Sequence, residues 1–207
     1  MSSTTLKVLF TLIISAFATV KITMAGDPNI LTDFVVPQGL SSIDGSFFTH
    51  TGFRALLLGN PQPKAFKVTK ASMVEFPALN GQSVSYAALQ FPGGSVNPPH
   101  THPRSAELLL VGQGSLQVGF VDTTNKLYTQ KLQEGDMFIF PKGLVHFQYN
   151  ADPKKAALAI SAFGSANAGT VSIPGTLFNT SIDDNVLALA FKTKVATIQT
   201  LKKSFAY

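Results

Sequence analysis

The amino-acid sequence predicts an all-β fold, an antiparallel sandwich or barrel between an extended N-terminal arm and short C-terminal helices. Short apolar runs recur from residue 71 onward, turn-forming Gly, Asn, Asp and Pro separate them, and helical periodicity is confined to the last part of the chain. The chain has 207 residues, of which 45% are hydrophobic and 13% are charged. This composition is sufficient for one compact core and does not fit a disordered chain.

Residues 1–25 have the pattern of a secretory signal peptide. Lys7 precedes an apolar stretch at residues 8–20, and the small side chains of Thr23 and Ala25 fit a cleavage site. Because the stretch is too short to span a bilayer, we expect a soluble, extracellular mature protein without a membrane anchor. Cleavage removes two of the 16 basic residues and none of the 11 acidic ones, so the net charge falls from +5 to +3. Nucleic-acid binding is therefore not expected, whereas attraction to acidic cell-wall polymers stays open.

Residues 26–70 are expected to form an extended arm and the first strands. Turn signals at Asp27-Pro28, Asp44-Gly45 and Gly59-Asn60-Pro61 interrupt the short apolar runs of this segment. His50 lies among phenylalanines here, and we interpret it as a structural residue.

Residues 71–175 are expected to form the barrel. Apolar runs of strand length alternate with turn signals such as Asn80-Gly81 and Glu134-Gly135-Asp136. This spacing is typical of antiparallel sandwiches and barrels. The expected strands cover residues 73–76, 84–91, 107–111, 115–121, 127–132, 137–140, 146–149 and 157–163.

Residues 176–207 change to a helical period and predict two short helices. Ser181, Asp183 and Asp184 are candidate N-caps, and the sequon that starts at Asn179 is a candidate glycosylation site. The apolar faces exceed what one barrel wall needs, so these helices could also cover a neighbouring subunit. Their apolar positions are Val186, Leu187, Leu189, Val195, Ile198, Leu201 and Phe205.

Three of the four histidines gather in two short segments, which indicates a metal site. His100 and His102 are two residues apart, so extended backbone places both imidazoles on one face, and the flanking prolines favour such backbone. Glu107 begins an apolar strand, where a lone carboxylate is costly to bury without a cation. His146 lies in a second predicted strand. A single buried histidine is more often an ordinary core residue, but the grouping reverses that expectation.

The candidate ligand set contains nitrogen and oxygen but no sulfur. It therefore argues against soft-metal and iron–sulfur chemistry. A carboxylate with imidazoles suits manganese or iron, and zinc stays open because affinity alone favours it.

The two histidine segments also match a pair of longer motifs. Gly94–Gly114 reads G-x5-H-x-H-x4-E-x6-G, and Gly135–Asn150 reads G-x5-P-x-G-x2-H-x3-N. These are the two cupin motifs without a substitution, and the flanking residues resemble the plant germins and germin-like proteins over essentially the whole mature chain. The resemblance implies a cupin jelly-roll β-barrel, one manganese ion per chain and assembly as a homo-oligomer, a trimer of dimers. The metal ligands that it implies are His100, His102, Glu107 and His146.

The resemblance also implies a function. Germin-like proteins are secreted to the plant apoplast and cell wall and are often defence-related, and the manganese site would support superoxide dismutase or oxalate oxidase activity on a small anion. Asn97 matches an asparagine with which oxalate-oxidising germins orient their substrate, so it is the candidate catalytic residue. A second asparagine of those enzymes corresponds to Ala87 here. Oxalate oxidation is therefore less expected than superoxide dismutation.

Two questions stay open at this stage. The protein could instead be a non-catalytic, metal-stabilised cell-wall or receptor-like binding protein, because a structural ion needs the same ligands. In addition, germins typically carry an N-terminal disulfide, whereas this chain has no cysteine and reads Asp33-Phe34-Val35-Val36-Pro37 in that region. A disulfide usually stabilises a folded protein by ~2–4 kcal/mol, and here this stabilisation must come from packing or assembly.

Overall fold

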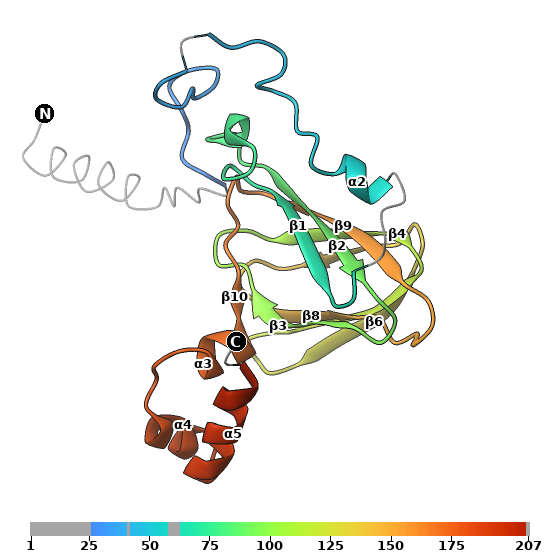
Figure 1. Ribbon diagram of the computed structural model, residues 1–207, viewed down its shortest axis with the longest axis vertical. Coiled ribbons are helices and arrows are strands. Elements are labelled where there is room, and N and C mark those ends of the chain that lie inside the picture. The colour runs from blue at the N-terminus through green and yellow to red at the C-terminus, as the bar shows by residue number, and fades with distance from the viewer. Residues whose placement is uncertain (1–25, 41, 58–62, 206–207) are drawn as a thin grey trace, which may run out of the picture.

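The computed structural model describes residues 26–40, 42–57 and 63–205, and shows two five-stranded antiparallel sheets packed face to face (Figure 1). This arrangement confirms the predicted all-β jelly roll. The signal peptide predicted for residues 1–25 and the turn predicted at residues 59–61 lie outside the described residues. No helix in the described part of the chain is long and apolar enough to cross a membrane.

The two sheets bring strands from distant parts of the sequence together. The first sheet has the order β1-β2-β9-β4-β7 and the second has the order β10-β3-β8-β5-β6. The first consists of β1 (Lys67–Ala71), β2 (Ser85–Phe91), β9 (Ala157–Phe163), β4 (Glu107–Gln113) and β7 (Met137–Phe140). The second consists of β10 (Val171–Ser172), β3 (Val96–Thr101), β8 (Val145–Tyr149), β5 (Ser115–Val121) and β6 (Leu127–Gln133).

The core lies between the sheets because each strand buries alternate side chains. In β4, Leu109 and Val111 are fully buried, whereas Leu108 and Leu110 are partly exposed on the outer face. This two-residue period places Glu107 on the same inner face as Leu109. The position of Glu107 in β4 therefore directs its carboxylate toward the interior of the barrel.

The strand predicted at residues 73–76 is wrong. Residues 73–75 form a turn, the 3₁₀ helix η1 (Pro77–Leu79) follows, and the strand of this region is β1, which ends at Ala71. The Glu75 carboxylate closes the turn by accepting hydrogen bonds from the amide and hydroxyl of Ser72. This side-chain contact outweighs the strand preference of the apolar residues at 73 and 74.

The N-terminal arm runs outside the barrel, on the side of β1 and β2, and contains one helical turn, α2 (Arg54–Leu57) (Figure 1). Its first described residues are anchored by Asp27. The Asp27 carboxylate accepts hydrogen bonds from the Ser165 hydroxyl at 2.7 Å and from the Ala166 amide at 2.6 Å. The Asp27 amide donates to the Ser83 hydroxyl at 3.0 Å. Hydrogen bonds thus tie the arm to the barrel in a chain without cysteine.

Up to residue 205, where the described part of the chain ends, three helices follow the barrel, whereas the sequence predicted two: α3 (Ile173–Phe178), α4 (Asp184–Ala190) and α5 (Val195–Phe205). α3 was missed because Pro174 and Gly175 read as helix breakers. Pro174 nevertheless occupies the first turn, where no amide is needed, and the Ser172 hydroxyl caps the helix by accepting from the Gly175 amide. Of the predicted N-caps, Asp183 caps α4. The helices project from one end of the barrel around a small apolar cluster of their own (Figure 1).

Candidate metal centre

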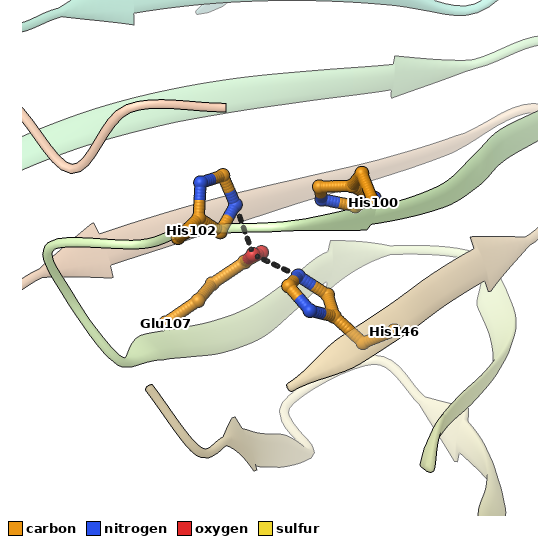
Figure 2. A group of neighbouring side chains, drawn as sticks. All are labelled: His100, His102, Glu107 and His146. Atoms are coloured by element: carbon orange, nitrogen blue, oxygen red, sulfur yellow. Dashed lines mark hydrogen bonds and ion pairs between the residues drawn. The ribbon is translucent and has the colours of Figure 1, made fainter. Parts of the chain in front are cut away.

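The four residues predicted as ligands converge at one place inside the barrel (Figure 2). His100 in β3 lies directly opposite His146 in β8, within one sheet. Glu107 reaches the same place from the start of β4 in the other sheet, and His102 lies one residue beyond the end of β3. The cluster therefore joins the two layers of the barrel.

The cluster is buried and tightly grouped. His100, His102, Glu107 and His146 are between 2% and 6% exposed, and one potential ligand atom from each lies within 4.8 Å of the others. Oε2 of Glu107 is 3.0 Å from Nε2 of His102 and 3.0 Å from Nε2 of His146. Such spacing leaves room for one ion among the four side chains.

Backbone carbonyls fix which nitrogen of each imidazole faces the centre. Nδ1 of His100 contacts the Pro98 carbonyl at 2.8 Å, and Nδ1 of His146 contacts the Leu144 carbonyl at 2.8 Å. Nδ1 of His102 contacts the carbonyl of Gly169. Because a carbonyl oxygen only accepts, each Nδ1 must carry the hydrogen, which leaves the Nε2 lone pairs directed to the centre. This is how neighbouring hydrogen bonds orient metal-binding histidines.

Two buried polar side chains orient the Glu107 carboxylate. Oε1 accepts a hydrogen bond of 2.6 Å from the Ser161 hydroxyl and one of 3.1 Å from Nε2 of Gln148. Ser161 and Gln148 are both fully buried. Since Oε1 is occupied by these donors, Oε2 is the carboxylate oxygen available at the centre.

The charge states of the cluster favour a cation. Burial lowers the pKa of His100 from 6.5 to about 4, so this ring is neutral at ordinary pH. Burial alone would raise the pKa of the Glu107 carboxyl, but the close approach of the His102 and His146 rings to the carboxylate outweighs burial and keeps this pKa well below its ordinary value. A carboxylate thus faces imidazole nitrogens that carry lone pairs.

The donor set fits a metal ion. Imidazoles whose ring hydrogen lies on Nδ1, together with a carboxylate whose Oε1 already accepts two hydrogen bonds, direct four acceptor atoms toward one another. Acceptors do not stabilise each other without a proton or a cation between them. Three nitrogens and one oxygen suit a borderline or hard divalent ion. The residues present can therefore hold the metal that the sequence predicts.

His50 lies apart from this cluster. Its ring stacks on Phe76 at 5.4 Å and packs edge-on against Phe53 at 5.5 Å. This packing agrees with the structural role expected for it.

A cavity of about 370 Å³ leads outward from the cluster, and Asn97 and Ala87 both line it. Nδ2 of Asn97 donates to Oε1 of Gln148 at 2.7 Å, and Gln148 in turn donates to Glu107. Sequence reasoning missed Gln148 and Ser161. The signal that could have found Gln148 is the strand period, which puts it two residues after His146 on the same inner face.

The segment 165–169 holds the Gly169 carbonyl in place, and this carbonyl contacts Nδ1 of His102. The Arg104 guanidinium donates to the Asn167 carbonyl at 2.6 Å and to its side-chain oxygen at 3.0 Å, and the Arg104 amide donates to the Ala168 carbonyl at 3.1 Å. Gly169 has φ +70°, and a Cβ there would lie 2.7 Å from the guanidinium. A side chain at this position would be strained by the positive φ, so glycine suits the place where the backbone directs its carbonyl to His102.

Comparisons with known proteins agree with this geometry. A family model described as Cupin matches residues 58–199. Germin-like protein 9-3 of rice, Oryza sativa subsp. japonica, is 64% identical over 191 residues, which cover 89% of each chain. A solved structure described as giving insights into the mechanism of oxalate oxidase has a TM-score of 0.77 and 32% identity, and covers 87% of this chain and 98% of its own. Oxalate oxidase in complex with the substrate analogue glycolate has a TM-score of 0.77, 31% identity and the same coverage.

Proposed function

This chain belongs to the germin-like proteins of the cupin family, and we propose that it is a secreted manganese protein of the plant apoplast that dismutates superoxide. One observation carries the proposal: three imidazole Nε2 atoms and one carboxylate oxygen meet in a buried cluster that opens into a cavity. Three histidines and a glutamate are the ligands that the resemblance to germins implies, and that resemblance favours manganese over iron or zinc.

Bound manganese would supply the Mn(II)/Mn(III) cycling that one-electron chemistry on superoxide requires. The residues of this chain hold the ligands in place and limit access. The Pro98, Leu144 and Gly169 carbonyls fix the three rings, and Gln148 and Ser161 fix the carboxylate. Dismutation requires few further side chains, because superoxide is small and needs no second hydrogen-bond donor to hold it.

Oxalate oxidation would require more from the cavity walls. The relatives include oxalate oxidase solved with the substrate analogue glycolate. Asn97 lines the cavity in this chain and has one amide hydrogen beyond the one it donates to Gln148. Ala87, however, offers only a methyl group at the other wall. We therefore assign the protein little or no oxalate oxidase activity, and Asn97 is a candidate catalytic residue for whichever anion binds.

The surface supports secretion and assembly. The exposed Asn179 lies at the C-terminal end of α3, where its side chain is accessible to glycosylation. The helices expose a set of large apolar side chains, and burying them between copies would stabilise a homo-oligomer such as a trimer of dimers. These side chains are Val186, Leu189, Phe191 and Leu201.

The test is to measure superoxide dismutation by the purified, manganese-loaded protein and by His102→Ala. Activity in the native protein and its loss in the variant are expected, because His102 supplies one of the four central atoms. His50→Ala is the matched control and should keep full activity. A native protein that carries manganese but does not dismutate superoxide would contradict the enzymatic proposal and favour a non-catalytic, metal-stabilised cell-wall or receptor-like binding protein.

A further inference from the structure

The cavity beside the candidate metal centre is larger than superoxide or a two-carbon dianion needs. Its volume is about 370 Å³, and sites for organic small molecules occupy roughly 300–1,000 Å³. The buried side chains of His100, His102 and Glu107 form its inner end, and exposed side chains such as Val68 and Val74 form its outer end. The space therefore runs from the cluster toward the surface.

The edge strand β1 forms one wall of the outer half. Lys70 pairs with Ala87 and Val68 pairs with Leu89 in the antiparallel register. Paired residues point to the same face of a sheet, so Val68 and Lys70 continue the inner face of β2 beyond the closed core. Val68 is 37% exposed there, whereas Leu89 is 3% exposed.

The walls between the two ends are mostly apolar. Ala87, Leu89 and Phe163 line the cavity from the first sheet and are all buried. At the mouth, burial would raise the pKa of Glu75, but hydrogen bonds from Ser72 and a smaller contribution from the charge of Lys70 hold it below its ordinary value, so the charges of Lys70 and Glu75 partly offset each other. Asn97 offers a ligand a polar side chain near the inner end of the cavity.

We propose that this cavity binds a monocarboxylate with an aliphatic or aromatic body. The carboxylate lies at the inner end beside Asn97, and the body lies along Ala87 and Leu89 toward Val68. A second carboxylate as in oxalate would meet the apolar wall at Ala87, where it would lose hydration without gaining a hydrogen bond. The proposal rests on the metal centre proposed above, because the metal attracts the carboxylate.

The experiment is calorimetric titration of the manganese-loaded protein with acetate, butanoate, hexanoate, 3-phenylpropanoate and oxalate. Each methylene that enters the apolar part of the cavity should raise the affinity roughly threefold to fourfold. Hexanoate and 3-phenylpropanoate should bind more tightly than both acetate and oxalate. Equal affinity along the series, or oxalate as the tightest ligand, would overturn the proposal.

A pair of variants tests where the apolar part of the bound monocarboxylate lies. Val68→Asp places a charge at the outer wall and should weaken hexanoate at least fivefold while leaving acetate unchanged. Val96→Asp is the matched control, because Val96 is an exposed strand valine that does not line the cavity, and it should change neither affinity. An unchanged hexanoate affinity in a folded Val68→Asp protein would overturn the proposed orientation.

Metal analysis of the same samples separates the two proposals. A protein that takes up no manganese would overturn the metal centre itself. A protein that holds manganese but gives a flat chain-length series would overturn only the ligand class. The series on the unmodified protein decides the ligand class even if Val68→Asp does not fold.

Discussion

The carboxylate of Asp27 accepts a hydrogen bond of 2.7 Å from the hydroxyl of Ser165, 138 positions later in the chain. This contact joins the start of the N-terminal arm to the segment whose Gly169 carbonyl orients His102. The Ser165 hydroxyl also accepts from the Asn167 amide, and the Asn167 side chain accepts from the Gly169 amide. The arm and the candidate metal centre are thus connected by a short series of hydrogen bonds.

We predict that Asp27→Ala weakens metal retention although Asp27 is not a ligand. The variant loses two charge-assisted hydrogen bonds, which should lower the free energy of unfolding by about 2 kcal/mol. It should also speed metal release about threefold to tenfold, because outer partners orient metal ligands. Asp33→Ala removes an exposed carboxylate of the same arm and is the matched control. Metal release by Asp27→Ala at the native rate, measured with a chelator, would contradict this coupling.

Oxalate oxidase activity should be very weak in the manganese-loaded protein, and Ala87→Asn should raise it. Removing a donor that acts in the transition state typically costs about 2.7–4 kcal/mol, or two to three decades in rate. Both activities should be assayed on one preparation, since superoxide dismutation does not depend on this position. Robust oxalate turnover by the unmodified protein would show that another residue supplies the missing donor.

The metal-free protein should lose stability on acidification. Burial lowers the pKa of His100 from 6.5 to about 4, so between these values the unfolded chain binds a proton that the folded chain does not. Stability therefore falls as the pH decreases through this window, by about 2 kcal/mol after allowance for partial screening. The low pKa of Glu107 acts in the same direction at still lower pH.

Denaturant unfolding of the metal-free protein at pH 7 and pH 4.5 measures this effect. His100→Gln removes the titrating group and should show a smaller difference between the two pH values. An equal difference in both proteins would assign the acid sensitivity to other residues.

Thermal unfolding should be insensitive to reductant and sensitive to protein concentration. The chain has no cysteine to reduce, and association stabilises a folded subunit by mass action. Melting temperatures with and without dithiothreitol should coincide, and they should rise over a range from low micromolar upward. A monomer in analytical ultracentrifugation whose melting temperature stays constant over that range would argue against assembly.

Much of the barrel follows from patterns that are local in the sequence. β4, β5 and β9 are runs of strand length that are rich in apolar residues, and turn residues bound them, so their positions are predicted to within about two residues. β1 could not be predicted in this way. Three of its five residues are polar because it is an edge strand whose inner face lines a cavity rather than the core.

The candidate ligands could be named from the sequence because metal sites need particular side chains at particular spacings. Their supporting partners could not be named as readily. Ser161 and Gly169 reach the cluster only through the packing of β9 and the following segment against β4 and β3, across long separations in the sequence. Similarly, the contact between Asp27 and Ser165 depends on where the start of the arm meets the barrel, which no periodicity encodes.

Metal content tests the central claim most directly. Elemental analysis of the purified protein should find about one manganese per chain, and His50→Ala should match it, because His50 packs against phenylalanines away from the cluster. His146→Ala should lose most of the metal, since it removes one of the four potential ligand atoms at the centre. Full manganese occupancy in folded His146→Ala would contradict the assignment of the metal centre.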